Sequence, residues 1–195
     1  MKKVCLTLII SFLLVSCSKD PMDRTIFIPD EDDSNLPAYT EWGYNSFGAE
    51  YEREYFLVSN KIVPCKITYK NNELQFLLSG TIKNDRTKMS LLFTFQSPEI
   101  LDFKELTQLH DYKIDLADSN ASVTIMQDGK TDMTVDVTEG SLYFKRVQLL
   151  SIDDKANRVI LSGLFDIRFI QSGFPVSISN GRFDVGITKD VFLAN

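Results

Sequence analysis

Apolar and polar side chains alternate along most of this chain, and that period of two limits the fold more than any other feature of the sequence. Leu74, Phe76 and Leu78 alternate with Gln75 and Ser79. Such alternation is typical of strands that bury one face and expose the other. The same pattern recurs in later runs that span residues 89–96, 133–138, 159–169 and 183–187. We therefore predict an all-β chain.

Short turn signals separate these runs. Asn71-Asn72, Asp128-Gly129 and Asn180-Gly181 each stand between two alternating runs, and such pairs tolerate the positive φ of tight hairpin turns. Residues 153–157 predict a longer loop, and residues 100–109 predict at most a short helical turn because they lack a long apolar stripe. Strands at this spacing predict an antiparallel β-sandwich, and a closed lipocalin-like β-barrel is the alternative.

The first residues have the pattern of a secretory signal. Lys2 and Lys3 precede an apolar run, Val4–Leu14, which is too short to span a bilayer because a spanning helix needs ~20 apolar residues. Leu14-Val15-Ser16-Cys17 resembles the lipobox of bacterial lipoproteins. The resemblance implies cleavage before Cys17, a diacylglycerol on the Cys17 thiol and an acylated (for example palmitoylated) amino terminus. Two or more acyl chains hold a protein stably at a membrane, whereas one chain does so only marginally.

The predicted domain organisation follows from this lipoprotein signal and from a change in composition along the chain. Residues 1–16 form the predicted lipoprotein signal peptide. Residues 17–38 are rich in Asp and Pro and predict a lipidated, flexible acidic tether, and residues 39–195 form a single all-β domain. Ser18 directly after Cys17 fits transport to the outer membrane, while the acidic residues that follow match surface-export signals only loosely. The cell surface and the periplasmic face therefore both stay open.

Charge and cysteine content exclude several classes of protein. The chain has 21 Lys and Arg against 27 Asp and Glu, for a net charge of −6, which argues against nucleic-acid binding because that needs clustered basic residues. Beyond the signal and the lipidated Cys17, the sequence contains only Cys65. An intramolecular disulfide is therefore excluded after processing, and Cys65 fits a buried structural thiol.

Aromatic residues are concentrated where the predicted domain begins. Tyr39, Trp42, Tyr44 and Tyr51 all occur within this short stretch. Aromatic rings offer flat apolar faces with polar rims, so these four residues are candidates for a platform on which sugars stack. Aromatic residues are also enriched in strands, and the same residues could instead belong to the first strands of the core.

The last third of the chain carries two short motifs, Ser162-Gly163-Leu164-Phe165 and Gly181-Arg182-Phe183. With Trp42 near the start of the domain, they resemble a group of small, uncharacterised Bacteroidota lipoproteins that end in Ser-Gly-x-Phe and Gly-x-Phe strands. The likeness covers roughly Trp42 to Ile187, and it implies compartment and architecture but no activity. It implies that Gly163 marks a strand irregularity, Gly181 a turn, and the phenylalanines core positions.

Catalytic and metal-binding motifs are missing from the sequence. It contains no Gly-x-Ser-x-Gly, no P-loop and no His-Glu-x-x-His, and the single His110 cannot form a site with several histidines. We therefore expect neither an enzyme nor a cofactor nor a metal. The predicted function is a membrane-anchored binding or interaction module of the outer envelope, with a glycan or an envelope protein as its partner. The alternatives are a carrier of apolar ligands and a carboxylate-based hydrolase, for which a cleft with perturbed carboxylates would argue.

Overall fold

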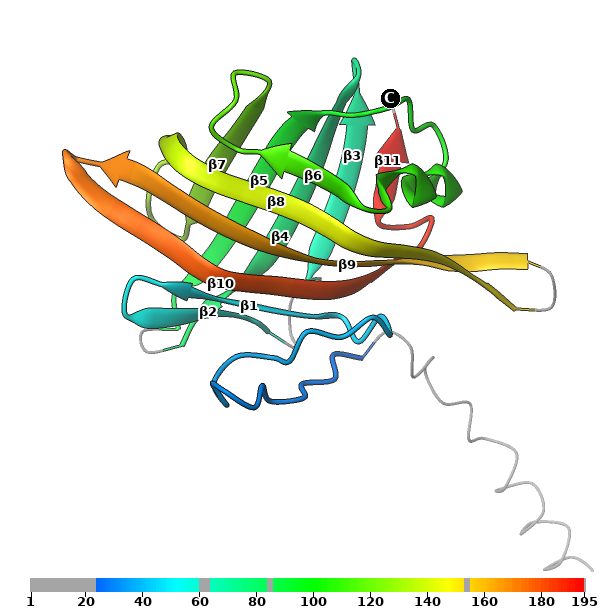
Figure 1. Cartoon of the computed structure of the whole chain (residues 1–195), viewed down its shortest axis with the longest axis horizontal. Coiled ribbons are helices and arrows are strands. Elements are labelled where there is room, and N and C mark those ends of the chain that lie inside the picture. The colour runs from blue at the N-terminus through cyan, green and yellow to red at the C-terminus, as the bar shows by residue number, and fades with distance from the viewer. Residues whose placement is uncertain (1–23, 60–63, 84–85, 153–154, 195) are drawn as a thin grey trace, which may run out of the picture.

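The computed structural model describes residues 24–59, 64–83, 86–152 and 155–194. The predicted signal peptide and Cys17 lie outside these residues. Within these described residues the structure is almost entirely β, with one 3-10 segment, η2 (Figure 1). The elements are β1 (Ser46–Tyr51), β2 (Glu54–Val58), β3 (Cys65–Lys70), β4 (Glu73–Ile82), β5 (Lys88–Gln96), η2 (Phe103–Leu109), β6 (Tyr112–Asp115), β7 (Ala121–Gln127), β8 (Met133–Ile152), β9 (Lys155–Gln171), β10 (Phe174–Ile187) and β11 (Phe192–Ala194).

The strands close into an antiparallel barrel of eight strands, with β3, β6 and β11 added outside the closed ring. Around the ring the order is β1, β2, β4, β5, β7, β8, β9 and β10, and β10 pairs with β1 to complete it. The all-β prediction is confirmed. The sheet takes the form of the barrel alternative instead of two packed sheets, because pairing β1 with β10 removes both edges of the ring.

The three predictions of tight turns are confirmed at two positions and wrong at the third. The longer loop predicted over residues 153–157 is also wrong, because β9 begins at Lys155, which pairs with Ile152 of β8. Asn71 and Asn72 have φ values of 54° and 65° in the β3–β4 hairpin, and Asp128-Gly129 lies between β7 and β8. Asn180-Gly181 lies inside β10, where the pairing with β9 shifts by one residue. Asn180 has a φ of 53° there, so its tolerance of the left-handed region forms a β-bulge and no turn. The hairpin turn between β9 and β10 is Ser172-Gly173.

Phenylalanine rings fill the inside of the barrel. The ring centroid of Phe76 lies 5.3 Å from that of Phe144 and 5.0 Å from that of Phe183, and Phe93 lies 5.5 Å from Phe165. All five rings are buried, and each contributes roughly 1.5–3 kcal/mol by leaving water. The alternating residues of the predicted runs therefore do face one common core.

Residues 24–38 belonged to the predicted tether, but they pack against the barrel. The Ile26 amide donates to the Tyr44 carbonyl over 2.8 Å, the Asp30 carboxylate pairs with Arg182 of β10 at 2.5 Å, and Leu36 is 1% exposed. The packed part of the chain thus begins before residue 39, because apolar side chains and an ion pair hold this segment on the barrel. Within the part of the chain that the structure describes, no helix is long and apolar enough to cross a bilayer.

Candidate functional site

A loop of residues 39–44, here named the Trp42 loop, is fixed to the barrel by one buried carboxylate. Asp184 of β10 is 1% exposed. Its oxygens accept hydrogen bonds from the amides of Trp42, Gly43 and Tyr44 at 3.1, 2.8 and 3.1 Å. The Thr40 hydroxyl donates over 2.6 Å. Charge-assisted bonds of this kind are stronger than neutral ones, so the backbone of the loop is held in one conformation.

Asp184 occupies an outward position of β10, between the inward Phe183 and Val185. It is buried because the Trp42 loop covers this part of the outer face. Ser162 of β9 lies opposite Asp184 in the sheet, and its hydroxyl donates to the same carboxylate over 2.9 Å. The buried polar residues of the described part of the chain gather around this position, and they are Asn45, Ser46, Arg158, Ser162 and Asp184. A polar layer therefore lies between the loop and the barrel.

Trp42 itself points away from this layer. Its side chain is 73% exposed, which is unusual for so large an apolar ring. With Tyr39 it lines a pocket of about 480 Å³, together with Thr40, Glu41, Gln148, Leu150 and Ile160. The structure thus brings two of the four predicted aromatic residues together.

Polar contacts orient Tyr39 in this pocket. Its hydroxyl donates to Glu41 over 3.0 Å, and the Lys145 ammonium lies 4.7 Å from the centre of its ring. Partial burial, followed by the bond to Glu41 and the nearby negative charges, raises the pKa of Tyr39 above its ordinary value of 10. The side chain of Gln148 donates to the Glu41 carbonyl over 3.0 Å. The pocket therefore combines an exposed indole with fixed polar groups.

Tyr44 and Tyr51, the other two predicted residues, lie elsewhere. Tyr44 serves the loop through its backbone, and it is absent from the lining of the Trp42 pocket. Tyr51 packs against the core, where burial raises its pKa, and it lines a separate pocket with Glu52 and Arg53. These two residues do not extend the aromatic platform around Trp42.

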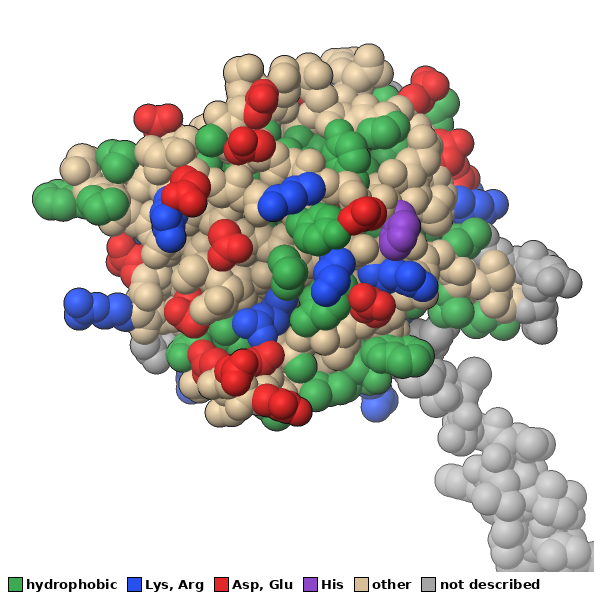
Figure 2. Space-filling view, viewed as in Figure 1, with side chains coloured by type: hydrophobic (Ala, Val, Ile, Leu, Met, Phe, Trp, Pro, Cys, Tyr) green, Lys and Arg blue, Asp and Glu red, His purple; other side chains and the backbone are tan. Residues whose placement is uncertain are grey.

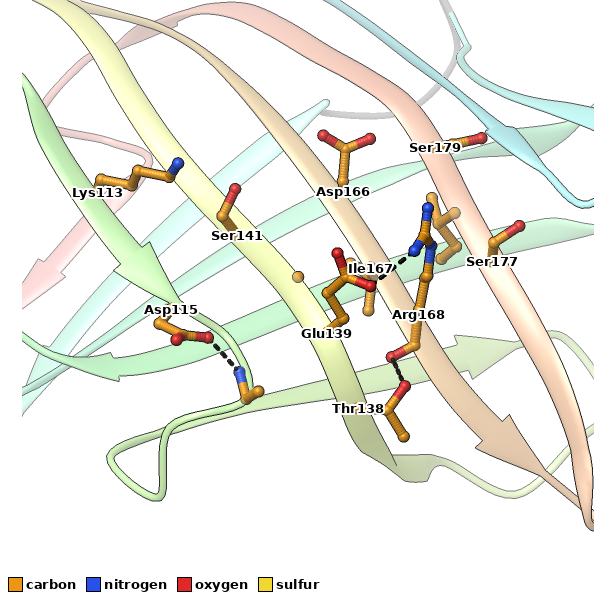
Figure 3. Close-up of a pocket in the computed structure, with 13 residues that line it drawn as sticks. Lys113, Asp115, Thr138, Glu139, Ser141, Asp166, Ile167, Arg168, Ser177 and Ser179 are labelled. Atoms are coloured by element: carbon orange, nitrogen blue, oxygen red, sulfur yellow. Dashed lines mark hydrogen bonds and ion pairs between the residues drawn. The ribbon is translucent and has the colours of Figure 1, made fainter.

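A second site, here named the polar cleft, lies on the outer face of β6, β8, β9 and β10. Its volume is about 760 Å³. Figure 2 shows acidic, basic and apolar side chains interspersed over this face. In Figure 3, the close-up of the cleft, Lys113 and Asp115 enter from β6, and Ser177 and Ser179 from β10. The remaining polar side chains come from β8 and β9 and are Thr138, Glu139, Ser141, Asp166 and Arg168.

Bulges in the strands form the floor of this cleft. The pairing of β8 with β9 shifts between Val137 and Glu139, and bulges bend the strand that carries them. At the next residue, Gly140, a Cβ atom would lie 2.5 Å from the Asp166 carbonyl oxygen. Only glycine allows the two backbones to approach this closely. The bend and the close approach together hollow the outer face.

Two acidic residues of the cleft have fixed partners. Glu139 forms an ion pair with Arg168 at 2.7 Å, although both side chains are exposed. Asp166 accepts a hydrogen bond from the Asn180 amide at 3.2 Å. Partial desolvation by the cleft walls raises the pKa of Asp166, while this hydrogen bond and the charges of Arg168 and Lys113 oppose the rise. Asp166 is thus a hydrogen-bond acceptor whose pKa is set by the balance between desolvation and these neighbouring groups.

The remaining reactive side chains do not form a site with each other. Cys65 is buried in the core, where burial raises the pKa of its thiol. His110 is exposed, and its Nδ1 accepts the Val147 amide at 3.2 Å. In residues 24–194, apart from the gaps named above, no group of three His, Cys, Asp or Glu is placed to hold a metal ion.

Comparison of the chain with protein-family models, with curated proteins and with solved structures gave no match. The site is therefore interpreted from its own geometry. Sequence reasoning found Tyr39 and Trp42 but missed Asp184 and the polar cleft. No local pattern could have identified them, because each depends on residues from distant parts of the chain.

Proposed function

We propose that this chain is a lipid-anchored binding module of the bacterial outer envelope and that the Trp42 loop captures carbohydrate chains. One observation carries the proposal: an indole that is 73% exposed stands on a loop held in place by the buried Asp184. A rigid, exposed aromatic face stacks well on the apolar C–H face of a sugar. Because the loop is already ordered, binding costs little further conformational entropy.

The chemistry beside the indole supports a carbohydrate ligand. Glu41 and Gln148 line the pocket with Tyr39 and Trp42, and their amide and carboxylate groups match the hydroxyls that rim a sugar ring. The inside of the barrel gives less support to the alternative of an apolar-ligand carrier, since Phe76, Phe144 and Phe183 pack against each other there.

The fluorescence of Trp42 provides the test, because it is the single tryptophan of the chain. Titration with a broad panel of oligosaccharides should give a saturable change in emission for at least one series. Trp42→Ala should abolish retardation of the protein in gels that contain the same polysaccharide. Phe174→Ala is the matched control, because Phe174 is 72% exposed but lies at the β9–β10 hairpin. A flat response to the whole panel, or equal loss in both variants, would contradict the proposal.

The anchor is tested separately at Cys17. The proposal predicts that wild-type protein is recovered with the membrane fraction, because its acyl chains insert into the bilayer. Cys17→Ala removes the thiol that would be lipidated, so the variant should appear in the soluble fraction. Retention of Cys17→Ala in the membrane fraction after a salt wash would show that some other contact holds the protein there.

The polar cleft favours one second candidate, a carboxylate-based glycoside hydrolase. Asp115 and Asp166 lie opposite Ser141 on either side in the sheet, so their Cα atoms are about 10 Å apart. Inverting glycosidases place two carboxyl groups at a comparable separation around the scissile bond. This function predicts that the protein releases reducing ends from an oligosaccharide and that Asp166→Asn abolishes the release. Equal release by both proteins would contradict it.

A further inference from the structure

The Trp42 pocket and the polar cleft lie on the same row of side chains of β9. Ile160 lines the Trp42 pocket, Ser162 donates to Asp184 below the loop, and Asp166 lines the polar cleft. Side chains two residues apart in a strand point to the same face, and each residue advances the strand by roughly 3.3 Å. Ile160 and Asp166 are therefore about 20 Å apart along one outer face.

Tyr143 and Lys145 of β8 occupy the space between the two sites. Tyr143 of β8 lies opposite Leu164 of β9, which is the row position next to Asp166. Its hydroxyl is bonded to Asp111. Lys145 follows on the same strand, and its ammonium lies over the ring of Tyr39 in the Trp42 pocket. One half-buried ring with a polar rim, Tyr143, therefore lies between the cleft and the Tyr39 ring of the Trp42 pocket.

Several polar side chains of the cleft are not held by hydrogen bonds or ion pairs within the described residues, although the charge of Lys113 does act on Asp166. Across the part of the chain that the structure describes, Lys113, Ser141, Ser177 and Ser179 make no side-chain hydrogen bond or ion pair. Serine hydroxyls both donate and accept, whereas the Lys113 ammonium only donates. The carboxylate of Asp166 lies on the strand next to Ser141 in Figure 3, and a carboxylate accepts hydrogen bonds. The cleft thus offers hydrogen-bond donors and acceptors, and it carries both a positive and a negative side chain. This combination fits an uncharged ligand with many hydroxyl groups, because each hydroxyl both donates and accepts.

We infer that the polar cleft is a second subsite for the same carbohydrate, so that one extended, neutral oligosaccharide lies along β9 from Trp42 to Asp166. The inference rests on the proposed function of the Trp42 loop. A chain long enough to reach both sites makes its second contact within an existing complex, so the local concentration of the second group is high. Affinity should therefore rise steeply once the oligosaccharide spans the distance between the sites.

The test compares short and long ligands of one chemistry. Cellobiose, maltose and xylobiose are titrated against the purified full-length protein beside the octasaccharides of the same three series, with the emission of Trp42 as the readout. We expect an octasaccharide to bind about a hundredfold more tightly than its disaccharide. Lys113→Ala and Asp166→Asn should each remove about tenfold of that advantage, which is the effect of losing a contact of moderate strength. Lys66→Ala, on the exposed side of β3, is the matched control and should retain it.

The outcomes separate this inference from the proposed function. Thermal melting and the emission spectrum without ligand show whether each variant is folded, and the isosteric Asp166→Asn keeps the shape of the cleft. If octasaccharides and disaccharides bind alike, or if the cleft variants keep the full length advantage, the second subsite is wrong while the Trp42 site stands. If no sugar of these three series binds, the inference is overturned for them, and a flat response to the broad panel as well overturns the proposed function.

Discussion

Replacing Asp184 with Ala should both loosen the Trp42 loop and destabilise the barrel. The carboxylate is the common acceptor for three loop amides and for the hydroxyls of Thr40 and Ser162. Alanine leaves these donors at a position where water does not reach, because Asp184 is 1% exposed. A donor left unsatisfied in a buried position costs about 1–3 kcal/mol. The loop can lift and recover part of this cost through hydration, so the losses do not simply add.

We expect a decrease of about 3–5 kcal/mol in the free energy of unfolding, because several buried donors lose their acceptor at once and each costs about 1–3 kcal/mol before the loop adjusts. At a urea slope of about 2 kcal/mol per molar, the midpoint would fall by about 2 M. Asp184→Asn should cost less than Asp184→Ala, because the amide retains one acceptor oxygen. The side chain of the Asp184→Asn variant would still direct an NH₂ donor towards backbone amides that also donate, so some stability should be lost.

Urea unfolding followed by circular dichroism and by Trp42 emission gives the measurement. Circular dichroism reports the strands, whereas the single tryptophan reports the loop. In wild type the two transitions should coincide, and in Asp184→Ala the emission should change at lower urea than the strands do. Asp136→Ala, at an exposed position of β8, is the control and should change stability by no more than about 0.5 kcal/mol. An Asp184→Ala midpoint equal to that of wild type would refute the role assigned to this carboxylate.

Two further predictions concern the core. Burial raises the pKa of the Cys65 thiol above its ordinary value of 9, so Cys65 should resist iodoacetamide in the native protein at pH 8 and react in urea, as peptide mass spectrometry would show. Because the unfolded chain loses this proton first, the contribution of Cys65 to stability should fall as pH rises above 9, and Cys65→Ala should remove that contribution. Phe144→Ala removes a ring that contacts Phe76, Phe95 and Phe183 and should lower the urea-derived free energy of unfolding by about 3–5 kcal/mol. A loss below about 1 kcal/mol would show that the interior is loosely packed.

The secondary structure was predictable because its main determinant is local. Leu74, Phe76 and Leu78 alternate with polar residues along the chain, and the structure buries those three side chains on one face of β4. Closure of the sheet into a barrel was harder to predict from the sequence, because it depends on β1 pairing with β10, which is far away along the chain. Alternation describes a single strand, so a sandwich and a barrel are equally compatible with it.

The wrong turn at Asn180-Gly181 has a specific physical cause. A tight hairpin and a β-bulge both use residues that tolerate positive φ, so the dipeptide alone does not distinguish them. Ser172-Gly173, the actual turn, carries a weaker signal of the same kind. The burial of Asp184 could not be predicted for another reason. The alternation pattern places its side chain outside the core, and only the distant residues 39–44 bury it.

The pairing of β1 with β10 also has a consequence for how the chain reaches its fold. Ser46 pairs with Asp184, so the ring closes only after nearly the whole chain is available. Folds dominated by such distant contacts form in about milliseconds to seconds, far more slowly than helical bundles. Until β10 arrives, β1 and β9 each present an open edge that can pair with another molecule. A chain truncated before Phe174 would lack β10 altogether. It would be left as an open sheet, and we expect it to aggregate.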